Sequence, residues 1–314
     1  MLKIFVAGAT GAIGRPLIKQ LIQEGHDVIG MARNEEAARQ LQQHGATAEI
    51  ADALDAEAVK SSLARTQPEV VINQLTALPK RYSPDTMRDA APVDRHLRQD
   101  GGTILQSAAE ECGARRYILQ SSAFWYEPGD GLADESSGFA VDASPYIADG
   151  SRFYRDLERT AHSIGGLELI ILRYGFLYGP HTWFARDGSI AEQMRNKQFP
   201  IVEDGKAVWS WVHVEDAATA AVLAINRGDS GTYNIVDDNP SQISVWLPAY
   251  ARWLAAAQPM RVSAREANDE DAIYNATQLR GASNAKAKRE LGFRPRPLEW
   301  LGRTAGEERT DAAA

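Results

Sequence analysis

Three glycines near the start of the chain have a spacing suited to binding phosphate. Gly8, Gly11 and Gly14 follow an apolar run, residues 2–7, that predicts a buried strand, and they precede an amphipathic helix. This spacing permits a tight turn, close approach of the main chain to a pyrophosphate, and close packing of helix on sheet. Main-chain N–H groups and the positive end of the helix then attract the anion. The segment therefore predicts a dinucleotide-binding turn.

Two arginines near this turn indicate which dinucleotide it binds. Arg15 follows the last glycine, and Arg33 follows the second predicted strand, where an acidic residue would bind the ribose hydroxyls of NAD. Guanidinium groups bind a phosphate through paired hydrogen bonds, so we predict NADP(H), with NAD(H) as the alternative. The other interpretation is that both arginines are solvated surface charges. Asp52, after the third predicted strand, is either an adenine contact or a turn residue.

Composition limits the classes of protein that the chain can represent. Its 314 residues, 44% of them hydrophobic, are enough for a large domain and a smaller one. The net charge of −8 disfavours a nucleic-acid partner. The single cysteine, Cys112, excludes an internal disulfide, and no metal site is expected. Because no cationic leader or long apolar run occurs, we expect a cytoplasmic protein without a membrane segment.

Strands and helices alternate through the first half of the chain, which predicts an α/β fold with a doubly wound parallel sheet. Residues 76–94 carry three prolines and are expected to be irregular. The predicted strands are 2–7, 26–32, 46–51, 69–75, 116–120 and 167–173. The predicted helices are 14–24, 34–44, 56–65, 103–112 and about 151–163.

The alternation stops after residue 173, which indicates a second unit. We assign 1–173 and 211–236 to a Rossmann-type domain, 174–210 and 237–303 to a smaller mixed α+β substrate lobe, and 304–314 to a tail. Within these ranges we predict helices at 190–196, 214–226, 245–256 and 285–291, and a strand at 232–236.

Five segments, taken together and in order, resemble the extended short-chain dehydrogenase/reductases, also called the NAD-dependent epimerase/dehydratase family. The resemblance implies a Rossmann domain for NAD(H) or NADP(H) and a lobe that closes over the nicotinamide. The segments are Gly8-x-x-Gly11-x-x-Gly14, Gln120-Ser121-Ser122-Ala123 before Tyr126, Leu172-Arg173-Tyr174-Gly175 before Tyr178-Gly179-Pro180, Val212-His213-Val214-Glu215-Asp216-Ala217, and Ser283-Asn284-Ala285-Lys286 before Glu290-Leu291-Gly292.

The resemblance also implies the residues that contact the cofactor. They lie in the glycine turn and after the second to sixth strands: Gly8, Thr10, Gly11, Ala12, Ile13, Gly14, Arg15, Arg33, Asp52, Leu54, Leu75, Ser121 and Tyr174.

The catalytic pattern of the family is broken in this chain. Members use a Tyr and, four residues later, a Lys that lowers the Tyr pKa, but the matching positions here hold Gly150 and Tyr154. Ser122 stands where the family keeps its hydroxyl. The nearest substitutes for the missing pair are Tyr146 and Tyr154, unless both only pack. Pro145 and Gly150 predict that their helix begins later, near residue 151, and a phenol without a neighbouring cation keeps a pKa near ~10.

The substrate lobe is expected to bind an apolar or aromatic molecule. Sugar-nucleotide members of the family place an arginine three residues before the Val-His-Val segment, where this chain has Trp209. Trp125, Phe176 and Trp183 are expected around the same cleft, unless they fill the core between the lobes. Arg280 either meets a polar group of the substrate or is a surface residue.

These features predict an NAD(P)H-dependent oxidoreductase that reduces a carbonyl or conjugated bond of a small, largely apolar metabolite. Reduction is favoured because deprotonating an unactivated alcohol would suffer most without the Tyr and Lys pair. The alternatives are an epimerase or dehydratase acting on a sugar or sugar nucleotide, and a non-catalytic NADP(H)-binding sensor. A homodimer is possible, since the family often forms one.

Overall fold

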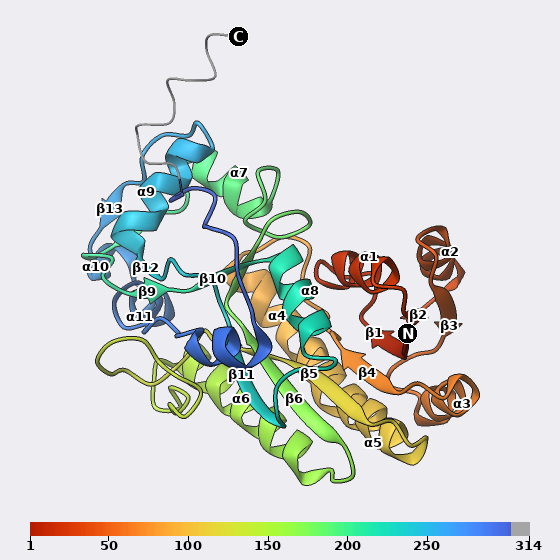
Figure 1. Cartoon of the computed structure of the whole chain (residues 1–314). Helices are drawn as coiled ribbons and strands as arrows, with labels where there is room; N and C mark the ends of the chain where they lie inside the picture. The colour runs from red at the N-terminus through yellow and green to blue at the C-terminus, as the bar shows by residue number, and fades with distance from the viewer. Residues whose placement is uncertain (303–314) are drawn as a thin grey trace.

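Seven parallel strands form the central sheet of the molecule (Figure 1). The structure is a computed structural model and describes residues 1–302. Across the sheet the order is β11-β6-β5-β4-β1-β2-β3, so the predicted doubly wound Rossmann-type fold is confirmed. The strands are β1 (Lys3–Ala7), β2 (Asp27–Ala32), β3 (Thr47–Ile50), β4 (Val70–Asn73), β5 (Arg116–Ser122), β6 (Glu168–Tyr174) and β11 (Gly231–Ile235).

Helices cover both faces of this sheet because successive side chains of a strand point to opposite sides. In β1, Ile4 and Val6 pack in one buried cluster and Phe5 and Ala7 in another. The first cluster includes α1 (Gly14–Gln23), α2 (Glu35–Gln43) and α8 (Val214–Leu223). The second includes α3 (Ala56–Thr66), α5 (Gly102–Glu111) and α6 (Pro145–Ser163).

The segment expected to be irregular is instead largely helical. Helix α4 (Pro84–His96) continues through a π-helical turn, η1 (Leu97–Gly101), into α5. Ser83 caps α4 in a reciprocal capping box, and Pro84 fits the first helical turn, where no N–H partner is needed. The prediction was wrong because Pro79 lies before the helix, Pro84 lies in its first turn, and the helix continues through Pro92.

Helix α6 also begins earlier than predicted, at Pro145 and not near residue 151. Pro145 again occupies the first turn of a helix. The earlier start places Tyr146, Gly150, Tyr154 and Glu158 at intervals of four along one helix. Because residues four apart share a face, these positions form a single ladder.

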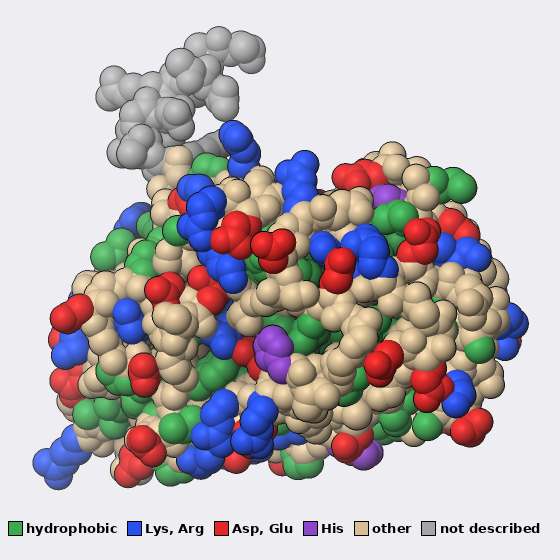
Figure 2. Space-filling model, turned by 60° about the horizontal axis from the view of Figure 1, so that its bottom comes forward, with side chains coloured by type: hydrophobic (Ala, Val, Ile, Leu, Met, Phe, Trp, Pro, Cys, Tyr) green, Lys and Arg blue, Asp and Glu red, His purple; other side chains and the backbone are tan. Residues whose placement is uncertain are grey.

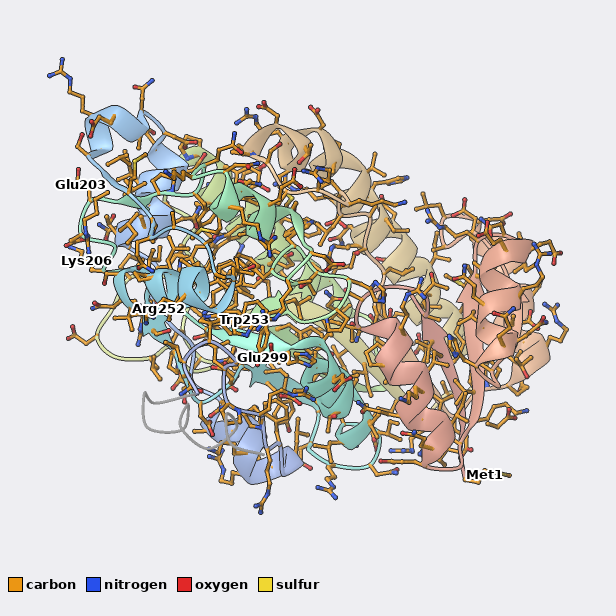
Figure 3. The ribbon with its side chains drawn as sticks, turned by 90° about the horizontal axis from the view of Figure 1, so that it is seen from above. Met1, Glu203, Lys206, Arg252, Trp253 and Glu299 are labelled. Atoms are coloured by element: carbon orange, nitrogen blue, oxygen red, sulfur yellow. The ribbon has the colours of Figure 1, made fainter. Side chains whose placement is uncertain are left out.

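The smaller lobe consists of short strands and helices (Figure 1), and its core is rich in tryptophan. Figure 3 places Glu203 and Lys206 in this lobe, at the opposite end of the molecule from Met1. The elements of the smaller lobe are α7 (Ser189–Arg195), β8 (Ile201–Val202), β9 (Val208–Trp209), β12 (Ser241–Gln242), α9 (Ile243–Trp253), β13 (Arg261–Val262), α10 (Ala264–Ala267) and α11 (Glu270–Thr277). Of these, helices α10 and α11 were not predicted from the sequence.

Two parallel strands, β7 (Phe176–Tyr178) and β10 (Trp211–His213), run where the chain passes between the sheet and the smaller lobe. The last helical turn, η2 (Ala287–Leu291), returns to the Rossmann core, where Leu291 and Phe293 are buried. Within residues 1–302, no helix combines the length and apolar character needed to cross a bilayer. The same residues hold no cluster of His, Cys, Asp or Glu suited to a metal ion.

Candidate functional site

The glycine turn lies where β1 and β4 are neighbours and the order of the strands reverses. Gly8 has φ of +78°, and a Cβ there would lie 2.2 Å from the carbonyl oxygen of Gln74, just after β4. A Cβ on Gly14 would lie 2.2 Å from the carbonyl oxygen of Gly8. A Cβ on Gly11 would meet only that same oxygen, at 3.3 Å, and Gly11 is exposed. The outer glycines therefore allow close packing, while the middle one leaves the surface of the turn accessible to a ligand.

The N-terminus of α1 is available for an anion. Among the described residues no side chain caps this helix, and its first turn holds no acidic residue. By contrast, Asn34 caps α2 and Asp55 caps α3 through side-chain oxygens. Unpaired N–H groups at the start of a helix attract negative charge. The residues of this turn therefore fit the pyrophosphate of a dinucleotide.

Two cationic side chains stand near this turn. Arg15, in the first turn of α1, and Arg33, just after β2, are both exposed, and neither forms an ion pair within the described part of the chain. Asp52, after β3, accepts a hydrogen bond from the N–H of Leu54 at 3.0 Å, which is the geometry of a turn residue. Leu54 is exposed, whereas Leu75 is buried.

Two of the predicted cofactor contacts have partners inside the protein. The Ser121 hydroxyl donates to Glu158 Oε1 at 2.6 Å. The Tyr174 hydroxyl accepts from Gln74 Nε2 at 3.1 Å and donates to the Ala217 carbonyl at 3.3 Å. Both side chains are buried and connect the carboxyl ends of the strands to α6 and α8.

Gly150, which stands where the family has its catalytic tyrosine, lies against the indole of Trp125. A Cβ on Gly150 would lie 2.1 Å from Cζ3 of Trp125. The ring of Trp125 is 6.0 Å from that of Tyr146 and 6.1 Å from that of Tyr154, between centroids. The structure thus brings together Trp125 and both predicted tyrosines on one face of α6.

Both tyrosines remain protonated at neutral pH. Burial raises the pKa of Tyr146 to about 12, and the neighbouring Tyr82 and Tyr154 add to the effect. Burial also raises the pKa of Tyr154, although the guanidinium of Arg98 opposes it. A phenol in this state donates a hydrogen bond or a proton but does not act as a base near pH 7.

Arg98 places a positive charge beside Tyr154, as the missing lysine would beside the family tyrosine. The sequence analysis did not identify it. Its guanidinium carbon lies 5.9 Å from the centroid of the Tyr154 ring. Arg98 is buried in η1, and its Nε donates to Asp94 Oδ2 at 2.7 Å. The signal was a helical i, i+4 pair of opposite charge, which was overlooked because residues 76–94 were expected to be irregular.

A buried ion pair holds the base of α6 against the sheet. Glu158 accepts from Arg173 Nη2 at 2.6 Å, and Arg173 Nη1 donates to the Tyr126 hydroxyl at 3.0 Å. Ser122, the last residue of β5, is buried, and its hydroxyl oxygen accepts from the N–H of Phe124 at 3.3 Å. These contacts fix the segment that carries Phe124 and Trp125.

Stacked aromatic rings extend from this segment into the smaller lobe. Phe124 stacks on Phe176 with centroids 4.3 Å apart, and Phe176 stacks on Trp209 at 3.9 Å. Phe124, which the sequence analysis did not select, and Phe176 are partly exposed, while Trp209 is 8% exposed. Trp183 donates its indole N–H to the Pro79 carbonyl at 2.9 Å. The predicted aromatic residues thus divide between a partly exposed surface and the core.

Arg280 has partners within the protein. It donates to the carbonyls of Gly131 and Asp130, each at 2.9 Å, and so ties the loop before α6 to the smaller lobe. On the face of the molecule drawn in Figure 2, acidic and basic side chains are interspersed with apolar ones.

The fold and the site define a class of protein. An open parallel sheet with a glycine turn and a free helix N-terminus at its switch point is a nucleotide-binding Rossmann domain.

Comparison with known proteins gives the family. Residues 4–236 match the NAD dependent epimerase/dehydratase family, and the chain belongs to it. The protein is therefore an NAD(P)-dependent oxidoreductase of the extended short-chain type, and the predicted resemblance is confirmed.

Individual relatives differ in their chemistry. The chain is 39% identical over 310 residues to a 3-diazoavenalumate denitrifying reductase of a Streptomyces species, covering 96% of this chain and 100% of that one. Two solved UDP-glucose 4-epimerases are similar in fold, each over 96% of both chains. The Thermotoga maritima enzyme with UDP-glucose has a TM-score of 0.74 at 19% identity, and the Thermus thermophilus enzyme in complex with NAD has 0.72 at 22%.

Proposed function

We propose that this protein is an NADPH-dependent reductase of a carbonyl, conjugated or diazo group in a small, largely apolar and planar metabolite. The observation that carries the proposal is the composition of α6. Its face toward Trp125 holds Tyr146, Gly150 and Tyr154, with no lysine to lower a phenol pKa. Such a face can donate a proton but cannot withdraw one from an alcohol near neutral pH.

The glycine turn, Arg15 and Arg33 would hold the cofactor. Main-chain N–H groups at the start of α1 suit its pyrophosphate, and the two exposed guanidinium groups suit a 2′-phosphate. Bound NADPH supplies a hydride. The partner that accepts this hydride must already be electrophilic, because the two phenols on α6 are weak acids that would activate it little.

The remaining polar groups position the substrate. Ser122 lies at the carboxyl end of β5, and Tyr146 and Tyr154 lie on the neighbouring helix α6. Because burial keeps both phenols neutral, they are suited to hydrogen-bonding the oxygen of a carbonyl and giving it a proton. Holding the acceptor in a fixed orientation then supplies much of the rate acceleration.

A diazo substrate is a second candidate, favoured by the relative that shares 39% of its residues with this chain. That relative is named as a denitrifying reductase of a diazo compound. An arenediazonium cation that accepts a hydride forms an aryldiazene, which releases N2 and leaves the arene. This sequence takes no proton from the protein, so it is compatible with the loss of the Tyr and Lys pair.

The test is NADPH oxidation, followed by its absorbance, with an arenediazonium salt, enones, quinones and aryl ketones. UDP-glucose serves as the sugar-nucleotide comparison, and reactions without protein measure the background. Gly8→Val is the control variant, because a side chain at position 8 collides with Gln74 and removes the turn. We expect turnover by the parent with at least one aromatic acceptor and none by the variant.

Two results would contradict the proposal. Tight NADPH binding without turnover of any acceptor would favour the non-catalytic sensor. Conversion of UDP-glucose without net NADPH oxidation would favour an epimerase.

A further inference from the structure

Gly150 and Trp125 form a matched pair across the site. The indole of Trp125 occupies the space into which any side chain at position 150 would project, with Cζ3 only 2.1 Å from an added Cβ. Real Cβ atoms do not approach other atoms this closely. A tyrosine at position 150 and the observed Trp125 are therefore mutually exclusive.

The indole is held from several directions. Tyr146 meets it edge-on, with ring planes at 81°, and Tyr154 lies at 58°. Phe124 also meets it edge-on, with ring planes at 72°. The main chain is held as well, since the Trp125 carbonyl accepts from the Ala140 N–H at 2.9 Å. A ring fixed at both its backbone and its edges can act as a rigid surface.

Trp125 is partly exposed, as are Phe124 and its stacking partner Phe176. Phe124 and Trp125 follow closely after Ser122, the residue that ends β5, and the Phe124 N–H donates to the Ser122 hydroxyl oxygen at 3.3 Å. An indole offers no acid or base, but it offers a flat surface on which another aromatic ring gains stacking energy. Saturated rings of the same size gain less.

We propose that Trp125 is a specificity-determining residue: its indole replaces the usual proton donor with a stacking surface that selects planar aromatic substrates. The inference rests on the proposed function, since it names the substrate class of that reductase. Gly150 is the positioning residue that makes the indole possible.

The test compares binding of benzoate and cyclohexanecarboxylate, which match in size and charge and differ in aromaticity. Titration calorimetry on protein saturated with NADP+ measures binding without turnover. We expect the parent to bind benzoate at least tenfold more tightly than cyclohexanecarboxylate. Trp125→Ala should lose this preference, and Trp125→Phe should keep most of it.

Trp253→Ala is the matched control. Trp253 is also a partly exposed indole, but it lies at the end of α9 in the smaller lobe (Figure 3), under the guanidinium of Arg186 at 3.8 Å. This variant should retain the full preference for benzoate.

A second measurement tests the pairing of the two positions. Gly150→Ala should lower the melting temperature in the parent, because the added methyl group collides with the indole. In the Trp125→Ala background the same change should lower it far less. Unfolding of both variants is followed by circular dichroism, so the comparison depends on neither substrate nor cofactor.

Several outcomes would overturn the inference. They are an unchanged preference in Trp125→Ala, no binding of benzoate by the cofactor-loaded parent, and equal effects of Gly150→Ala in both backgrounds. If the Trp125-dependent preference is found but no acceptor is reduced, the proposed function fails and the stacking surface stands. If aromatic acceptors are reduced equally by the parent and Trp125→Ala, the proposed function stands and the stacking surface fails.

Discussion

Arg33 is the residue on which the choice of dinucleotide depends most directly. Its side chain is exposed just after β2, beside a turn whose helix has no cap within the described chain. A guanidinium that binds a phosphate contributes about 1.5–3 kcal/mol, whereas an acidic side chain there would repel it. We therefore expect Arg33→Asp to weaken NADPH binding roughly 10- to 100-fold and to spare NADH, measured by titration calorimetry. Arg39→Asp, an exposed charge on α2, is the matched control and should change neither affinity.

Single residues were predictable where their role is local. The glycine turn was found because all its members lie within seven positions and act through the main chain. The sequence did not show why position 150 holds a glycine, because the indole that fills the space beside it comes from position 125. Arg98 was missed for a similar reason, since its proximity to Tyr154 exists only after the chain has folded.

At the scale of elements, the strands of the central sheet were predicted well because most buried parallel strands are continuous apolar runs bounded by turns. The short strands outside this sheet were not predicted: β7, β8, β9, β10, β12 and β13. Helix α4 was not predicted, although it carries a capping box and a proline in its first turn. The start of α6 was placed too late because Gly150 lowers helix propensity, an effect that tertiary packing overrides here.

The helix from α4 through η1 to α5 is fixed by a buried ion pair. Asp94 and Arg98 are both buried, and Asp94 Oδ1 also accepts from the Ala77 N–H at 2.6 Å, which ties α4 to the chain after β4. Removing one member of a buried pair leaves an uncompensated charge. We expect Arg98→Met to lower the free energy of unfolding by about 3–5 kcal/mol, measured in urea.

The same helix carries an exposed ion pair that serves as the control for the loss of stability in Arg98→Met. Arg88 and Asp85 form an exposed pair on α4, and such pairs contribute at most about 1 kcal/mol. Arg88→Met should therefore leave the urea midpoint almost unchanged. Equal effects of the two substitutions would mean that Asp94 finds another partner or reaches water.

At the scale of the whole molecule, the alternation of strands and helices predicted the doubly wound sheet, but it did not predict the contacts between the sheet and the segments that leave it. Asp237 illustrates this. It follows β11, is buried, and donates its N–H to the Trp211 carbonyl at 2.6 Å, where the chain leaves the sheet for the smaller lobe. Its Oδ1 accepts from the Asn239 N–H at 2.9 Å, while its Oδ2 has no partner among the described residues.

This carboxyl group makes the stability of the whole chain depend on pH. Burial raises the pKa of Asp237 to about 7 from an ordinary 3.8, and the carboxylates of Asp238 and Asp216 add to it. Below about pH 4 the folded and unfolded states both hold the proton. Between about pH 4 and pH 7 only the folded state holds it, so this group lowers stability as pH rises, by up to about 4 kcal/mol once pH exceeds 7.

Asp237→Asn removes that penalty and keeps the acceptor for Asn239. We expect the stability of the variant relative to the parent, from urea unfolding, to be about 3 kcal/mol greater at about pH 8 than at about pH 5. Asp187→Asn, at an exposed position, should show the same difference from the parent at both pH values. A difference for Asp237→Asn that does not change with pH would mean that the carboxylate is ionised in the folded protein throughout this range.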